Sequence, residues 1–185
     1  MAYPVILKTP RFILRPPMTS DAAQIAACLN DREVAWNLGR VPHPYLATDA
    51  EAWLRDVPEK WIKGEAYTFA VTHLKDEMVG CVSLRLLPMD VWEFGYWLAK
   101  PLWGLGNTSE AAIAVIDYAE ERLALDQFTS AHFIANPDSG RILTKLGFEP
   151  VGETVLFGMA RGTEAPCIRY TRGTDPDLAL RLVAH

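Results

Sequence analysis

The chain has 185 residues, of which 50% are hydrophobic and 22% charged, and its formal net charge at pH 7 is −5. This composition is typical of a globular protein and excludes broad disorder, and we expect one domain over residues 1–185. The acidic balance argues against nucleic acid as a partner, because phosphate binding needs clustered Lys and Arg. It mildly favours a cationic partner, although solubility alone explains the charge equally well.

The sequence contains no run of 18 or more apolar residues and no signal-peptide pattern near Met1. We therefore expect no membrane partner and a cytoplasmic location. The three cysteines, Cys28, Cys81 and Cys167, are far apart, and no histidine cluster accompanies them. This spacing predicts buried thiols and no metal site.

In chain order, the hydrophobic pattern predicts about seven strands, which are rich in β-branched and aromatic residues. The expected strands are Phe12–Leu14, Tyr67–Thr72, Met78–Leu86, Trp92–Leu98, Phe128–Ala135, Thr154–Met159 and Ile168–Thr171. The early strands are joined by turns, whereas a helix separates the strand ending at Leu98 from the one near Phe128. This alternation predicts an α/β (α+β) fold, with a mixed sheet and helices on both faces.

Four helices are predicted between these strands. The first covers Thr19–Leu29, and the second begins with a capping box at Thr48-x-x-Glu51 and is expected to end or kink at Pro58. The third begins near Glu110 and carries an apolar stripe. The fourth covers Asp138–Leu146, with Gly147 at its C-terminus.

A glycine-rich turn before the third helix is the most informative segment. It consists of Trp103, Gly104, Leu105, Gly106, Asn107 and Thr108. Two glycines allow consecutive N–H groups to converge on an anion at a helix N-terminus, and Asn107 with Glu110 has the spacing of a capping box. Ser109 stands where a dinucleotide-binding fingerprint needs glycine, and no lysine follows as a Walker A loop requires. An ordinary tight turn remains an equal alternative.

Motifs on both sides of the turn resemble the GNAT superfamily of N-acetyltransferases, specifically its RimJ/RimL-like, ribosomal-protein N-acetyltransferase branch. The matching segments are Thr9-Pro-Arg-Phe-Ile-Leu-Arg15, Asp31-Arg-Glu-Val34, Glu93-Phe-Gly-Tyr-Trp-Leu98, Trp103-Gly-Leu-Gly106, Ser109-Glu-Ala111, Asn136-x-x-Ser139 and Leu146-Gly-Phe-x-x-x-Gly-Glu153. Together, in this order, they run nearly from end to end. The resemblance implies a mostly antiparallel sheet in which one parallel strand pair splays apart to hold acyl-CoA.

The resemblance also implies a binding role for each part of acetyl-CoA. Backbone N–H groups of Trp103 to Thr108 would bind the pyrophosphate. The strand edge at Tyr96, Trp97 and Leu98 would pair with the pantetheine amides, and an N–H near Leu98 would polarise the thioester carbonyl. Asn136 would contact the pantetheine arm while capping its helix, with Pro137 at the first helical position.

For the chemistry, Glu93 is the candidate base that accepts the amine proton, directly or through water; an exposed strand-edge charge is the competing interpretation. Many members of the superfamily have a tyrosine that protonates the leaving thiolate where this chain has Leu143. Ser139 becomes the candidate donor, with solvent as the alternative, and Ser139 is also expected to contact coenzyme A. His132 faces either the site or, as an ordinary histidine, the core or the surface.

The resemblance implies acetyl transfer from acetyl-CoA to a primary amine, such as a protein or peptide N-terminus. A small-molecule acceptor, such as a polyamine, an amino acid or an aminoglycoside-like compound, is the close alternative. A non-catalytic acyl-CoA sensor belongs to a different class, and the missing tyrosine leaves room for it. Homologues often dimerise, so a homodimer is one assembly to consider.

Overall fold

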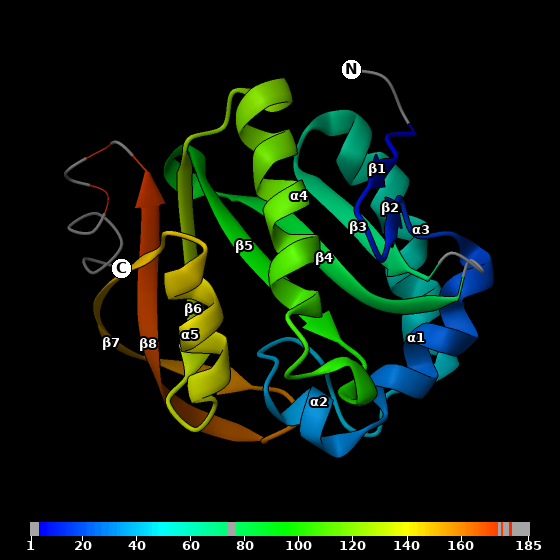
Figure 1. The fold of residues 1–185 in the computed structure, drawn as a ribbon. Helices are drawn as coiled ribbons and strands as arrows, with labels where there is room; N and C mark the ends of the chain where they lie inside the picture. The colour runs from blue at the N-terminus through cyan, green and yellow to red at the C-terminus, as the bar shows by residue number, and fades with distance from the viewer. Residues whose placement is uncertain (1–3, 74–76, 174, 176–177, 179–185) are drawn as a thin grey trace.

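The computed structural model describes residues 4–73, 77–173, 175 and 178. In this part of the chain eight strands form one sheet, in the order β1-β2-β3-β4-β5-β6-β8-β7 (Figure 1). The strands are β1 Leu7–Lys8, β2 Ile13–Arg15, β3 Ala66–Thr72, β4 Met78–Leu87, β5 Val91–Leu98, β6 Gln127–Phe133, β7 Glu149–Gly158 and β8 Thr163–Gly173. All neighbours are antiparallel except β5 and β6, which are parallel. The predicted mixed, mostly antiparallel sheet is confirmed.

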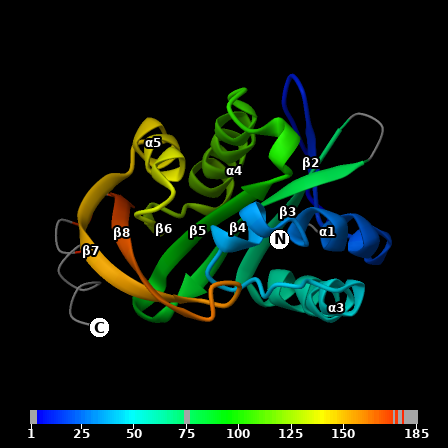
Figure 2. The same ribbon diagram turned by 90° about the horizontal axis from the view of Figure 1, so that it is seen from below.

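Helices cover both faces of this sheet. They are α1 Ala22–Leu29, α2 Arg32–Trp36, α3 Ala47–Lys63, α4 Asn107–Leu123 and α5 Pro137–Lys145. In Figure 2, α4 and α5 lie on one face and α1 and α3 on the other. Among the described residues, no helix is both long and apolar enough to cross a membrane.

The predicted apolar stripe of α4 forms its buried face. Ala112, Ile116 and Ala119 are at most 3% exposed, and Ala111 and Val115 widen this face. They pack into the core of aromatic and β-branched side chains from the central strands. Burial of apolar surface against the sheet contributes roughly 25 cal/mol per Å², which fixes α4 against β4 and β5.

Three local predictions differ from the structure. Helix α3 continues through Pro58 to Lys63, so the proline neither ends it nor separates it into two helices. The α3 N-terminus is capped by Asp49, whose carboxylate accepts from the Leu46 N–H over 2.8 Å, rather than by the Thr48-x-x-Glu51 pair. Of the three thiols, Cys81 and Cys167 are buried but Cys28 is partly exposed.

The parallel strands β5 and β6 splay apart after a short paired stretch. Their register consists of Trp92 with Phe128 and Glu93 with Thr129. One residue further, the pair is joined by a side chain, because Ser130 Oγ donates to the Phe94 carbonyl oxygen over 2.9 Å. The splayed pair expected from the sequence is therefore present, and it opens toward the C-terminal ends of both strands.

The tip of the β7–β8 hairpin meets the segment after α2. The Met159 N–H donates to the Gly39 carbonyl oxygen over 3.0 Å, and Arg161 Nε donates to the Trp36 carbonyl oxygen over 2.8 Å. The Arg161 guanidinium also lies over the Phe133 ring, 4.2 Å from its centroid, at the end of β6. The hairpin thus connects the β6–β8 side of the sheet to the helices that cover the β1–β4 side.

Candidate active site

The predicted phosphate-binding turn lies between β5 and α4. Gly104 and Gly106 both have φ of 74°, a conformation that glycine adopts without steric cost. Gly106 directly precedes the first turn of α4. The N–H groups of that turn have no partners in the preceding helical turn and point toward the glycine-rich segment, which is the arrangement that binds anions.

The capping box predicted from Asn107 and Glu110 is wrong. Asn107 is the first residue of the helix rather than its cap, and its side-chain amide donates to the Leu102 carbonyl oxygen over 3.0 Å. The left-handed Gly106 makes the turn by itself, so no side-chain cap is needed. Trp103 is bonded in a similar way, since its indole Nε1 donates to the Leu98 carbonyl oxygen over 2.8 Å. The turn is therefore fixed to the end of β5.

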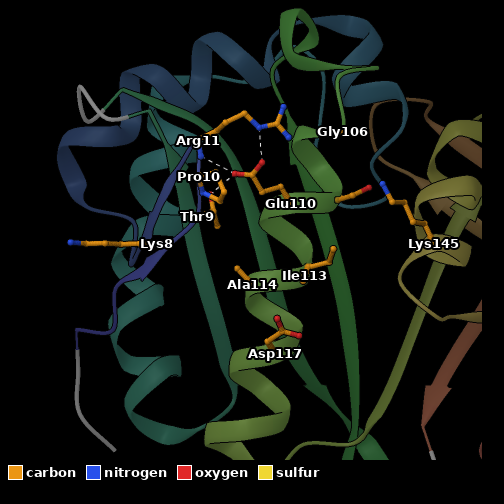
Figure 3. A pocket seen from close by; sticks show the side chains of 11 residues that line it. Lys8, Thr9, Pro10, Arg11, Gly106, Glu110, Ile113, Ala114, Asp117 and Lys145 are labelled. Atoms are coloured by element: carbon orange, nitrogen blue, oxygen red, sulfur yellow. Dashed lines mark hydrogen bonds and ion pairs between the residues drawn. The ribbon is translucent and has the colours of Figure 1, made fainter.

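Glu110 instead binds the turn between β1 and β2 (Figure 3). Its carboxylate accepts from Thr9 Oγ1 over 2.6 Å, from the Arg11 N–H over 2.9 Å and from Arg11 Nε over 2.5 Å. Arg11 Nη1 also donates to the Leu105 carbonyl oxygen over 3.0 Å, inside the glycine-rich turn. Burial alone would raise the pKa of Glu110, but these hydrogen bonds and the Arg11 charge outweigh it and lower the pKa.

An open pocket of about 460 Å³ lies beside this contact, along the outer surface of α4. Lys8, Arg11 and Lys145 bring positive charge to its walls, and Glu110 and Asp117 bring negative charge. Figure 3 shows Lys145 reaching toward the pocket from the α5 side and Arg11 from the β1–β2 turn. The pocket adjoins the glycine-rich turn, because Gly106 is one of its lining residues.

The free edge of β5 presents backbone groups to the gap between the splayed strands. The N–H of Ala99, the residue after β5, donates to the carbonyl oxygen of Val79 in β4. In an antiparallel ladder the bonding direction alternates, so the N–H and C=O groups of Tyr96 and Leu98 face away from β4. The carbonyls of Phe94 and Leu98 follow this pattern, since they accept from Ser130 and Trp103 on that side.

Tyr96 and Ser139 meet on the α4–α5 side of the gap. Their hydroxyl oxygens are 2.7 Å apart, and the Tyr96 hydroxyl also lies 3.1 Å from the Ser139 carbonyl oxygen. Asn136 caps α5 as predicted, with Oδ1 accepting from the Ser139 N–H over 3.4 Å and Pro137 following it. Burial raises the pKa of Tyr96 to about 12, with the Ser139 hydrogen bond opposing it and Tyr170 adding to it.

Glu93 lies on the opposite face of β5, because side chains alternate along a strand. Its carboxylate accepts from Arg40 over 2.7 and 3.0 Å and from Arg85 over 2.9 and 3.1 Å. Burial would raise the pKa of Glu93, but hydrogen bonds and charge from the two arginines outweigh it and lower the pKa. The Glu93 side chain is 29% exposed. It is therefore an ionised carboxylate that remains accessible to solvent.

Other predicted residues are placed away from the reacting groups or in the core. Leu143 is fully buried, and Trp97 packs against the core between the sheet and α1 and α3. His132 is 6% exposed, and its Nδ1 lies 2.9 Å from the Phe133 carbonyl oxygen, so the core interpretation is correct. Within the described residues, no three His, Cys, Asp or Glu side chains are grouped to hold a metal ion.

Sequence reasoning missed the two arginines that bind Glu93. Arg85 is the cross-strand partner of Glu93 in the β4–β5 hairpin, so pairing the strands about the turn at Pro88–Asp90 would have found it. Arg40 lies in the segment after α2, 53 residues from Glu93 in sequence, and no local signal connects them. The contact between Tyr96 and Ser139 was missed for the same reason.

Comparison with known proteins identifies the class to which this fold and site belong. The family model "Acetyltransferase (GNAT) domain" matches residues 11–149. The chain is 26% identical over 159 residues to the uncharacterized N-acetyltransferase p20 of Bacillus licheniformis, covering 84% of this chain and 89% of that protein.

Solved structures share the fold. The ribosomal-protein-S5-alanine acetyltransferase of Vibrio fischeri matches with a TM-score of 0.81 at 22% identity, over 93% of this chain and 98% of that one. RimL, a ribosomal L7/L12 alpha-N-protein acetyltransferase in complex with coenzyme A, matches with a TM-score of 0.81 at 18% identity, over 94% and 100% of the two chains. These two structures and this chain therefore share one fold.

The chain belongs to the acetyltransferase (GNAT) domain family, and it is an acetyl-CoA-dependent N-acetyltransferase. Sequence motifs, family model and fold agree on this assignment. The acceptor amine is not defined by family membership, because one fold supports many acceptors.

Proposed function

We propose that the protein transfers the acetyl group of acetyl-CoA to the α-amine of a protein or peptide, by direct attack of the amine on the thioester. The observation that carries this proposal is the splay between β5 and β6, with the glycine-rich turn at one end and Tyr96 and Ser139 beside it. In this arrangement the unpaired edge of β5 offers backbone groups to an extended acyl-pantetheine chain. It also leaves the Glu93 face of β5 available to a second substrate.

Each part of the coenzyme has a matching group in this proposal. The N–H groups from Gly104 to Thr108 bind the pyrophosphate, whereas the Trp103 N–H already donates to the Lys100 carbonyl oxygen over 3.1 Å. Lys8, Arg11 and Lys145 supply positive charge nearby. Backbone groups of Tyr96 pair with the pantetheine amides, because the Leu98 carbonyl oxygen already accepts from the Trp103 indole. The Leu98 N–H donates to the thioester oxygen, where negative charge develops during attack. Asn136, at the start of α5, contacts the pantetheine arm.

Glu93 acts as the proton acceptor, directly or through water. An α-ammonium group has a pKa of about 8, so roughly a tenth of it is neutral at pH 7. A carboxylate with a lowered pKa is a weak base toward this group. It becomes adequate once the carbon–nitrogen bond has begun to form, because the attacking nitrogen is then far more acidic. The two arginines keep Glu93 ionised and ready for that step.

A small-molecule acceptor that carries a negative group is the second candidate. It is favoured by the guanidinium groups around the Glu93 face, in a chain whose net charge is −5. Arg40 and Arg85 bind Glu93, and Arg32 and Arg161 flank the Trp36 ring at 4.9 and 5.0 Å from its centroid. An amine next to a carboxylate, as in an amino acid, suits such surroundings.

The test is release of coenzyme A thiol from acetyl-CoA with a panel of acceptors at pH 7 and pH 8.5. The panel contains peptides that differ in the first residue, each also made with an acidic or a neutral second residue, together with amino acids and polyamines. Turnover of peptides with free N-termini, and none after N-terminal blocking, supports the proposal. Turnover of free amino acids alone supports the second candidate.

The Glu93→Gln variant separates an enzyme from a sensor of acyl-CoA. An enzyme that relies on this carboxylate loses turnover while keeping its affinity for the coenzyme. A protein that binds acetyl-CoA tightly but releases no thiol with any acceptor would contradict the proposal.

A further inference from the structure

Two hydroxyl groups from different elements meet in the gap that holds the proposed coenzyme site. Tyr96 extends from β5 and Ser139 from the first turn of α5, and their oxygens are 2.7 Å apart. The Tyr96 hydroxyl is also 3.1 Å from the Ser139 carbonyl oxygen. This contact lies on the α5 side of the free edge of β5, along which the proposed function places the acyl-pantetheine chain.

The hydroxyl hydrogens of Tyr96 and Ser139 can be arranged in two ways in this contact. In the first, Tyr96 donates to the Ser139 carbonyl oxygen and receives the Ser139 hydroxyl hydrogen. In the second, Tyr96 donates to Ser139 Oγ, and the serine hydrogen is released to another acceptor. Each hydroxyl has only one hydrogen, so only the second arrangement offers the serine hydrogen to a ligand. Negative charge on a nearby sulfur favours this second arrangement.

Gly140, the residue after Ser139, lies close to a buried polar pair, His132 and Tyr170. His132 Nδ1 must donate to the Phe133 carbonyl oxygen at 2.9 Å, because a carbonyl only accepts. In the neutral ring Nε2 is then an acceptor, and the Tyr170 hydroxyl lies 3.4 Å from it. Both groups lie directly under Gly140: a Cβ there would be 2.6 Å from Nε2 and 3.1 Å from the Tyr170 oxygen.

We propose that Tyr96 is a positioning residue that turns the Ser139 hydroxyl hydrogen toward the leaving sulfur. This inference rests on the proposed function, and it gives the chain a substitute for the tyrosine that is absent at position 143. The carbon–nitrogen bond forms, the carbon–sulfur bond breaks, and the electron pair stays on sulfur. Ser139 stabilises this thiolate by a hydrogen bond, while Tyr96 donates to Ser139 Oγ and strengthens the serine as a donor.

The thiolate of coenzyme A takes its proton from solvent, because the thiol is more acidic than the Tyr96 and Ser139 hydroxyl groups. A thiol is more acidic than a tyrosine or serine hydroxyl by more than about one pKa unit, so neither hydroxyl transfers its proton permanently. The pKa of Tyr96, raised to about 12 chiefly by burial, keeps it a neutral donor at all pH values of interest. The amine proton leaves through Glu93 or water, and solvent supplies the proton that converts the thiolate to the thiol.

The direct test is the pKa of the coenzyme A thiol when bound, followed through the ultraviolet absorbance of the thiolate. The wild-type protein is expected to lower this pKa, so that coenzyme A binds roughly tenfold more tightly above the transition than below it. Desulfo-coenzyme A, which lacks the thiol, is the matched ligand and should show no such change. Tyr96→Phe and Ser139→Ala should both abolish the difference while binding desulfo-coenzyme A as the wild type does.

Turnover gives a second, independent measurement. Tyr96→Phe is expected to lower kcat by about tenfold with little change in the KM for acetyl-CoA, which is the range for one hydrogen bond to a charged group. Adding Tyr96→Phe to Ser139→Ala should cause no further loss, because the tyrosine acts through the serine. Tyr67→Phe removes a hydroxyl elsewhere in the sheet and should leave kcat unchanged.

The outcomes also separate this inference from the function on which it rests. If the wild type binds coenzyme A with an unshifted thiol pKa, or if Tyr96→Phe keeps full kcat, the role of Tyr96 is wrong and acetyl transfer still stands. A wild type that binds neither coenzyme A nor desulfo-coenzyme A would overturn both. Equal melting temperatures for the variants confirm that a loss of kcat does not come from unfolding.

Discussion

Arg40 and Glu93 are joined by two hydrogen bonds, of 2.7 and 3.0 Å, between a segment that follows α2 and the middle of the sheet. Together with Arg85, this contact lowers the pKa of Glu93 against the opposing effect of burial. The ionisation state of the proposed base therefore depends on a residue from a different part of the chain.

Replacing Arg40 with Gln should move the acid limb of the pH–rate profile to higher pH. The substitution removes a positive charge that favours the ionised carboxylate, so the pKa of Glu93 rises. Because the ionised form is the active one, activity is lost at higher pH than in the wild type and is retained at alkaline pH. The check is kcat with both substrates saturating from pH 4 to 9, because kcat reports groups in the complex, whereas kcat/KM would also report the free amine, whose pKa is about 8. Arg55→Gln, an exposed arginine on α3, is the control, and an unshifted limb in Arg40→Gln would exclude Glu93 as the titrating group.

The contact of Arg11 with Glu110 and the glycine-rich turn predicts a selective effect on coenzyme binding. Arg11→Met leaves the Glu110 carboxylate unneutralised near the proposed pyrophosphate and removes the bond to Leu105. We expect the Kd for acetyl-CoA to rise about tenfold, or ~1.4 kcal/mol.

The control donor is S-acetylpantetheine, which lacks the pyrophosphate and should react equally with both proteins. Lys63→Met, which breaks an exposed ion pair on α3, is the control variant. An equal loss with both donors would mean that Arg11 acts on the fold rather than on phosphate binding.

The close packing of Gly80 in β4 against β5 leads to a prediction about the coenzyme-binding edge of β5. A Cβ at this position would lie 2.5 Å from the Trp97 carbonyl oxygen and would collide with the Leu98 side chain. Gly80→Ala must push β5 away, at a cost of about 1–3 kcal/mol in unfolding free energy. It should also weaken coenzyme binding, because the displaced residues carry the open edge.

Denaturant unfolding and calorimetric titration with coenzyme A measure the two effects of Gly80→Ala. At Gly39 the nearest atom to an added Cβ is 3.9 Å away, so Gly39→Ala should change neither quantity. Normal coenzyme binding by a destabilised Gly80→Ala protein would contradict the role assigned to this strand edge.

Arg161 offers a test of a partly buried charge. Its guanidinium lies over two rings, and burial lowers its pKa, with Cys167 opposing this effect. Its Nη2 is buried and has no hydrogen-bond partner within the described residues. Arg161→Leu keeps much of the packing and removes the unsatisfied donor, so we expect a stability within about 1 kcal/mol of the wild type.

Arg161→Ala removes the packing as well and should cost about 2–3 kcal/mol more. Urea unfolding of the two variants makes the comparison. If leucine is as damaging as alanine, the cation–ring contacts and the Trp36 hydrogen bond dominate, and the buried charge is net stabilising.

The structural features that depend on a local sequence pattern were predicted from the sequence. Strand composition located the sheet, Asn136 followed by Pro137 located the start of α5, and the Gly104-Leu105-Gly106 turn located the start of α4. Such features need only a few neighbouring residues. The resemblance to known motifs then supplied the splayed strand pair, which no local rule would have given.

The features that the sequence did not predict are contacts between segments that are far apart in the chain. Asn107 and Glu110 have the spacing of a capping pair, yet one binds Leu102 and the other binds Thr9 and Arg11. Glu110 shows why the pattern misleads: a carboxylate is bound by the strongest donor within reach, and that donor is 99 residues away in sequence. Spacing indicates which bonds are available locally, but it cannot exclude a better partner in the folded chain.

The hairpin tip at Met159 and Arg161 determines how the opening between β5 and β6 behaves. The two strands are paired at one end by Trp92 and Phe128, and at the other end the hairpin joins the segment after α2. The β6–β8 side of the opening is thus hydrogen-bonded to the segment after α2, on the β1–β4 side of the sheet. This contact limits how far the two parts of the sheet can move apart when a ligand binds.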